Sequence, residues 1–94
     1  MTFDARMEQL RLRFQARAGE DRARLEESVA GERWDEILRI AHGLSGIAGV
    51  FGHHEVGEAA QLVEEAIDTG LGPEGVRPLC AALIERLERV GQPA

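Results

Sequence analysis

The sequence has few of the features on which secreted, membrane-spanning or nucleic-acid-binding proteins depend. It contains one cysteine, so no internal disulfide can form. It has no run of about 18 uncharged apolar residues and no basic start followed by an apolar segment, so neither a membrane span nor a secretion signal is predicted. Its 17 acidic and 11 basic residues leave a net charge of −6, which argues against a basic face for nucleic acid. We therefore expect a cytoplasmic protein with no nucleic-acid or membrane partner.

Length and composition leave room for one small domain. The chain has 94 residues and no lysine, asparagine or tyrosine, so that all 11 basic residues are arginine. A chain this short buries only about 60–65% of the surface that its unfolded form exposes, and therefore needs a regular core. We expect residues 1–94 to form a single domain. Because Met1 is followed at once by a predicted helix, a free-standing protein is favoured over a fragment.

Apolar residues recur at helical spacing in five stretches, and no strand pattern competes with them. The predicted helices span about residues 3–16, 20–30, 33–51, 54–68 and 73–90. The break around Gly19 is either a helix end or only a kink, and the acidic pair Glu20 and Asp21 suits a helix start there. The sequence thus predicts an all-α fold, an antiparallel four-helix bundle with an additional N-terminal capping helix formed by residues 3–16.

The third predicted helix displays a histidine on its exposed side. On a helical wheel its apolar stripe lies within about 40° of Ile37, whereas His42 falls at about 140°. The same helix contains Gly43, Gly46 and Gly49, although an interior glycine costs about 1 kcal/mol relative to alanine. Glycines beside the imidazole leave room for another protein's surface or a phosphoryl group. Close helix packing is the alternative explanation, and it suits Gly43 better than Gly46.

Glu64 is predicted to lie level with His42. In an antiparallel hairpin that turns near His53, the two positions are equally far from the turn. A carboxylate at this place can accept a hydrogen bond from one imidazole nitrogen and leave the lone pair of the other nitrogen free as a nucleophile. A solvated glutamate is the simpler alternative.

Residues 41–46 read Ala-His-Gly-Leu-Ser-Gly, with a further glycine at position 52. This pattern, in a helix of this length and a chain of this size, resembles the histidine-containing phosphotransfer (HPt) domain, whose signature is Ala-His-x-Leu-Lys-Gly with a second glycine six residues later. The pair Val63-Glu64 looks like the family's Leu-Glu pair on the next helix. One departure is clear: the family lysine three residues after the histidine is Ser45 here. Arg39, one turn before His42, could supply the missing positive charge.

The resemblance implies a phosphorelay intermediate of bacterial two-component signalling. His42 would accept a phosphoryl group from the phosphoaspartate of a receiver domain, or from a histidine kinase, and pass it to a response-regulator receiver. Glu64 would orient the imidazole. The residues expected to face the phosphoryl group or the partner are Leu38, Arg39, Ser45, Gly46 and Gly49.

The resemblance also bears on cofactors and partners. The protein would act as a covalent phosphocarrier without kinase activity of its own, because no Gly-rich nucleotide loop precedes a helix. We expect no cofactor on this chain and a divalent metal on the receiver. The expected partners are receiver domains and a sensor histidine kinase, and we expect a monomer, although no sequence feature demands one.

Two other functions stand as alternatives to phosphotransfer. The same bundle could be a non-catalytic docking module that binds a receiver or kinase, which the serine at position 45 favours. A metal site formed by His42, His53, His54 and Glu55 is disfavoured, because adjacent helical residues point about 100° apart. In addition, His42 would lie about 16 Å along the axis from His53.

Overall fold

The structure is a computed structural model that describes residues 2–90. It contains the helices α1 (Phe3–Ala30), α2 (Trp34–Ile47), α3 (His54–Asp68) and α4 (Pro73–Val90), with a 3-10 turn, η1 (Ala48–Phe51), between α2 and α3. No strand occurs in the described part of the chain. The all-α prediction is confirmed, and so are the expected bounds of α3 and α4.

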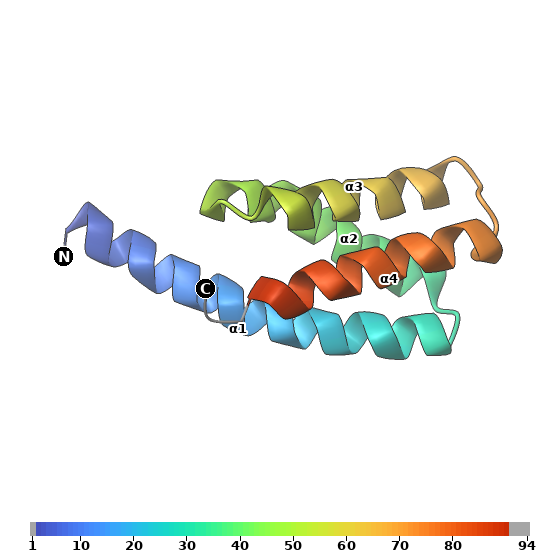
Figure 1. The fold of residues 1–94 in the computed structure, drawn as a ribbon, viewed down its shortest axis with the longest axis horizontal. Helices are drawn as coiled ribbons and strands as arrows, with labels where there is room; N and C mark the ends of the chain where they lie inside the picture. Colours follow the sequence, from blue (N-terminus) through green and yellow to red (C-terminus); the bar gives the residue numbers. More distant parts are fainter. Residues whose placement is uncertain (1, 91–94) are drawn as a thin grey trace.

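The four helices form an antiparallel bundle (Figure 1). Around the bundle α1 packs on α2, α2 on α3, α3 on α4, and α4 on α1. The connections between them are short, so successive helices must run in opposite directions. None of the described helices combines the length and the apolar character that a bilayer span requires.

The prediction of a separate N-terminal capping helix was wrong. Residues 3–16 and 20–30 belong to one continuous helix of 28 residues, α1, with Thr2 as its N-cap. A single glycine costs only about 1 kcal/mol in a helix, and no proline accompanies Gly19 to remove a backbone hydrogen bond. The i,i+4 pair Arg17–Asp21 also spans this point. Asp21 therefore does not lie at a helix start but in the middle of α1, where it is buried.

The first turns of α1 extend past the ends of α3 and α4 and give the molecule its elongated shape of 47 × 21 × 21 Å (Figure 1). Consistent with this, Phe3 is exposed and Met7 and Leu10 are only half-buried, whereas Phe14 is buried. The apolar stripe of residues 3–14 was predicted correctly as helical. Only its C-terminal end reaches the core.

The core consists of the predicted apolar stripes of α2, α3 and α4, together with buried residues of α1. Those of α2 and η1 are Ile37, Ile40, Ala41, Leu44 and Ala48; those of α3 are Val56, Ala59, Ala60, Val63 and Ala66; those of α4 are Val76, Cys80, Leu83, Leu87 and Val90. The regular helix α2 ends at Ile47, earlier than expected, and the chain continues through η1. Gly52 then turns the chain with φ +80°, a left-handed conformation that glycine adopts without strain.

The ring of His53 closes this turn onto α1. It stacks on Phe14 with 5.1 Å between ring centroids, and Phe51 lies 5.6 Å from the same Phe14 ring. His53 precedes α3 and His54 is its first residue, as expected of polar residues that open this helix. These ring contacts tie the turn that precedes α3 to α1.

Candidate functional site

His42 stands on the outer face of α2. Its neighbours Ala41 and Leu44 are fully buried, so the helix face is fixed and the His42 side chain must point outward. The side chain is 76% exposed. The imidazole is therefore open to a large partner, as the wheel predicts.

Glu64 of α3 contacts the imidazole. Its Oε2 lies within hydrogen-bond distance of His42 Nδ1, although the two residues are 22 positions apart in sequence. An ionised carboxylate only accepts hydrogen bonds, so Nδ1 must carry the proton and donate it. Nε2 then keeps its lone pair. The Glu64 side chain reaches the ring from α3 and is only 20% exposed. A carboxylate in this place can hold an imidazole in one orientation and one tautomer.

Ser45 occupies the place of the family lysine and turns toward the same carboxylate. Its Oγ lies 3.2 Å from Glu64 Oε1 and 2.9 Å from the carbonyl oxygen of His42. A hydroxyl has one proton to donate, so these two acceptors share or alternate it. Ser45 is half-buried between α2 and α3. It thus contacts the second oxygen of the Glu64 carboxylate and supplies no positive charge.

The three glycines of this region have different surroundings. A Cβ built at Gly46 would meet no atom within 4 Å, so this side of α2 is open next to His42. At Gly49 a Cβ would lie 3.6 Å from the Nδ1 atom of His54. At Gly43 it would lie 3.0 Å from Nη2 of Arg17, which is tighter than ordinary contact. Gly43 therefore makes room for a side chain of this same molecule, whereas Gly46 leaves space for another molecule.

Arg39 and Leu38 lie before His42 on α2. The Arg39 side chain is 76% exposed, and its Nη1 donates to Glu36 Oε2 at 3.2 Å, one turn back along the helix. The guanidinium is thus directed away from His42. Leu38 is half-buried. Both residues lie on the same helix as His42, and among the described residues neither forms a hydrogen bond or ion pair with the imidazole.

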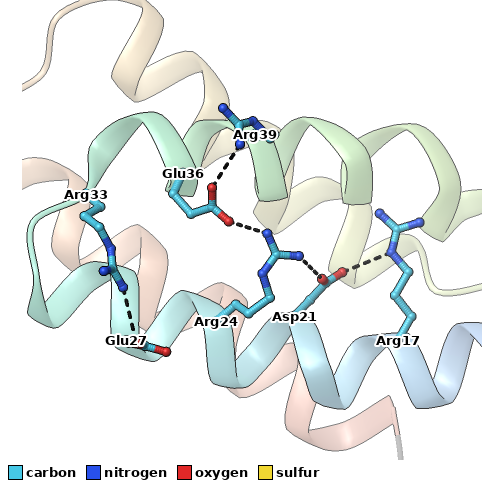
Figure 2. Close-up of polar contacts among 7 residues, drawn as sticks. All are labelled: Arg17, Asp21, Arg24, Glu27, Arg33, Glu36 and Arg39. Atoms are coloured by element: carbon cyan, nitrogen blue, oxygen red, sulfur yellow. Dashed lines mark hydrogen bonds and ion pairs between the residues drawn. The ribbon is translucent and has the colours of Figure 1, made fainter.

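A chain of ion pairs between α1 and α2 was missed by the sequence analysis (Figure 2). Arg17 and Arg24 both approach the buried Asp21, with Arg17 Nε 3.3 Å from Oδ2 and Arg24 Nη1 3.7 Å from Oδ1. Arg24 also reaches Glu36, which in turn accepts from Arg39. The i,i+4 spacing of Arg17 and Asp21 was a usable signal, but the predicted break at Gly19 separated them.

Burial dominates the electrostatics of Asp21. Desolvation raises the pKa of its carboxyl above the ordinary value of 3.8, although the neighbouring Arg17 and Arg24 act in the opposite direction. The side chain is only 5% exposed, so water does little to stabilise its charge. The two arginines are therefore the chief counter-charges of this carboxylate.

Across residues 2–90, no three His, Cys, Asp or Glu side chains cluster closely enough to hold a metal ion. His53 is engaged with the ring of Phe14, and His54 lies against Gly49. The polar groups that converge on His42 are the carboxylate of Glu64 and, through it, the hydroxyl of Ser45. Such an arrangement suits an imidazole that acts as a nucleophile.

Comparison with known proteins agrees with this geometry. The Hpt domain family matches residues 9–92, which is almost the whole chain. No curated protein and no solved structure gives a significant match. The family is one of phosphotransfer in two-component signalling, and its members interact with receiver domains and kinases in phosphorelays. With its all-helical bundle and a match over residues 9–92, the chain belongs to the Hpt domain family.

Proposed function

We propose that the protein is a phosphorelay intermediate of a bacterial cytoplasm and that His42 is its phosphoacceptor. The observation that carries this proposal is the exposed imidazole whose Nδ1 is held by Glu64, because it leaves Nε2 as a free nucleophile facing solvent. The donor is the phosphoaspartate of a receiver domain or the phosphohistidine of a sensor kinase. The acceptor is a second receiver.

The transfer step needs no proton movement on this chain. His42 Nε2 attacks the phosphorus of the phosphoaspartate, the N–P bond forms, and the acyl P–O bond breaks. The aspartate leaves as a carboxylate, and the ring becomes an N-phosphorylated imidazolium. The Nδ1–H···carboxylate bond to Glu64 then joins a positive ring to a negative group, so it is stronger after transfer than before.

The partner would complete the site. No metal cluster occurs among the described residues, and the divalent ion that balances the phosphoryl charge is expected on the receiver. The docking face would be the outer side of α2 around His42. Gly46 lacks a side chain there, and Leu38, Arg39 and Ser45 lie on the same helix. Gly49, also predicted to face the partner, lies beyond the end of α2 in η1, where its Cβ position is next to His54.

Intact-mass measurement in alkaline solution after incubation with phosphorylated receiver domains tests this proposal. The wild type is expected to gain one acid-labile phosphoryl group, and His42→Ala none. His54→Ala is the matched control, since it removes another exposed histidine and should still be phosphorylated. Phosphorylation of His42→Ala to the wild-type level would refute the assignment.

A docking module without phosphotransfer is the second candidate. Its support is Ser45, which leaves the position of the family lysine without a positive charge. Receiver domains would then bind the wild type with measurable affinity in titration calorimetry and leave its mass unchanged. A mass gain at His42 would exclude this candidate.

A further inference from the structure

Arg17 of α1 carries a positive charge to the helix on which His42 lies. Figure 2 shows its side chain rising from α1 toward α2, with the guanidinium at the end. Nε is bound to Asp21 Oδ2 at 3.3 Å, and Asp21 is buried, so the carboxylate anchors the inner edge of the guanidinium. The arginine is thus held at one end and not freely mobile in solvent.

The outer edge of the same guanidinium lies against Gly43. The position that a Cβ would occupy there is 3.0 Å from Arg17 Nη2. A residue with a Cβ at this position would require the guanidinium to shift by a few tenths of an ångström. Gly43 directly follows His42, and consecutive Cα atoms are about 3.8 Å apart. The absence of a side chain at position 43 therefore lets the guanidinium lie against the backbone of α2 at the residue next to His42.

The terminal nitrogens of Arg17 are available to a ligand. Of its five N–H donors, the structure of residues 2–90 engages only Nε. The side chain is 47% exposed, so an incoming anion can reach the Nη groups. Arg39 differs, because Glu36 binds its Nη1 and holds it one turn away in the other direction. Arg17 is the one of the two that is held by a buried carboxylate and keeps both terminal nitrogens free among the described residues.

We propose that Arg17 binds the phosphoryl oxygens during transfer to and from His42 and so supplies the positive charge that Ser45 does not. This inference rests on the proposed function. The bonds made and broken are those given above, and Arg17 forms only hydrogen bonds to the equatorial oxygens, whose charge it balances as the phosphorus passes to Nε2. Asp21 is a positioning residue, since it touches Arg17 and not the phosphoryl group.

Single-turnover phosphorylation of His42 tests the role of Arg17. We would use two donors, a phosphorylated receiver and the small molecule phosphoramidate, because only the first depends on docking. Arg17→Ala is expected to slow phosphorylation by both donors about tenfold or more, the loss expected of a hydrogen bond to a charged group. Arg17→Lys should retain part of the rate. Arg13→Ala, an exposed arginine one turn earlier on α1, should match the wild type.

The outcomes separate the two proposals. If the wild type is phosphorylated and Arg17→Ala stays within about twofold of Arg13→Ala, the inference about Arg17 is wrong and the proposed function stands. If no donor phosphorylates the wild type, the proposed function fails first. Denaturant unfolding of each variant, followed by circular dichroism, shows whether a slow variant is still folded at the assay temperature.

Gly43→Ala provides a second test in which Arg17 and Asp21 are both kept. The added methyl group shifts the guanidinium by a few tenths of an ångström from its present contact, and it raises rather than lowers helix propensity, so the variant should remain folded. Phosphorylation by phosphoramidate is expected to slow in the wild-type background and to be unaffected by the same change in the Arg17→Ala background. Equal slowing in both backgrounds would show a steric effect on His42 itself and overturn the proposal.

Discussion

Replacement of Glu64 by alanine should slow phosphorylation of His42 without unfolding the protein. Glu64 is the residue that touches Nδ1, and among residues 2–90 no other charged side chain is bonded to the imidazole. Hydrogen bonds to charged groups contribute about 1.5–3 kcal/mol. Because the His42 side chain is 76% exposed, water replaces part of this contribution, and we take the lower end. About 1.4 kcal/mol corresponds to a tenfold lower rate.

The assay is single-turnover transfer, together with nitrogen NMR of the imidazole. In the wild type Nδ1 should carry the proton of the neutral ring, and in Glu64→Ala this preference should be lost. Glu65→Ala is the matched control, since Glu65 is the next residue of α3 and is exposed. A rate and a tautomer for Glu64→Ala equal to those of Glu65→Ala would refute the role of Glu64.

Three further predictions concern stability. The wild type should be more stable than Asp21→Asn at low pH, and this difference in the free energy of unfolding should shrink as pH rises. The raised native pKa of Asp21 makes the native state bind more protons than the unfolded chain. The stability that Asp21 adds is therefore largest below pH 3.8 and falls as pH rises through the native pKa. Urea unfolding of both proteins between about pH 3 and pH 7 checks this sign, and a growing wild-type advantage would contradict it. Leu83→Ala should lower the free energy of unfolding by about 2–5 kcal/mol, because Leu83 is fully buried. Leu62→Ala, on the exposed face of α3, should change it by less than about 0.5 kcal/mol. Trp34 fluorescence follows the unfolding of both variants. Gly19→Ala should stabilise the protein by up to about 1 kcal/mol, since Gly19 is helical and a Cβ there meets no atom of residues 2–90 within 4 Å. A loss of stability, measured by calorimetry, would show that α1 is interrupted in solution.

The elements that the sequence predicted well are those governed by a local period. The stripes of α2, α3 and α4 repeat every three or four residues, and burial of one helix face follows directly from that period. The contact between His42 and Glu64 was also predictable, because two antiparallel helices joined by a short turn place residues equally far from the turn side by side. Its catalytic role remains a prediction.

The continuity of α1 was not predictable from the same signals. Gly19 looks like a helix break in a one-dimensional pattern, but a break would require a gain elsewhere to offset the lost backbone hydrogen bonds. Here the helix instead packs on both α2 and α4, and this tertiary packing exceeds the small cost of one glycine. The burial of Asp21 follows from that packing and was missed for the same reason.

The position of the positive charge proposed near His42 also depends on the three-dimensional arrangement of the helices. A lysine at position 45 would lie beside Glu64, since Ser45 Oγ is 3.2 Å from its Oε1, and would compete with His42 for that carboxylate. With serine at position 45, no cation from this position competes with the imidazole for the negative charge of Glu64. The cation proposed here comes from the other flank of α2, through Arg17, whose own counter-charge is the buried Asp21. Under these proposals the two carboxylates serve two different cations: Glu64 serves the ring that becomes charged, and Asp21 the guanidinium that would bind the phosphoryl group. The motif around His42 could not reveal this arrangement, because Arg17 and Asp21 lie on α1. The place that the end of a long arginine side chain reaches does not follow from the helical period.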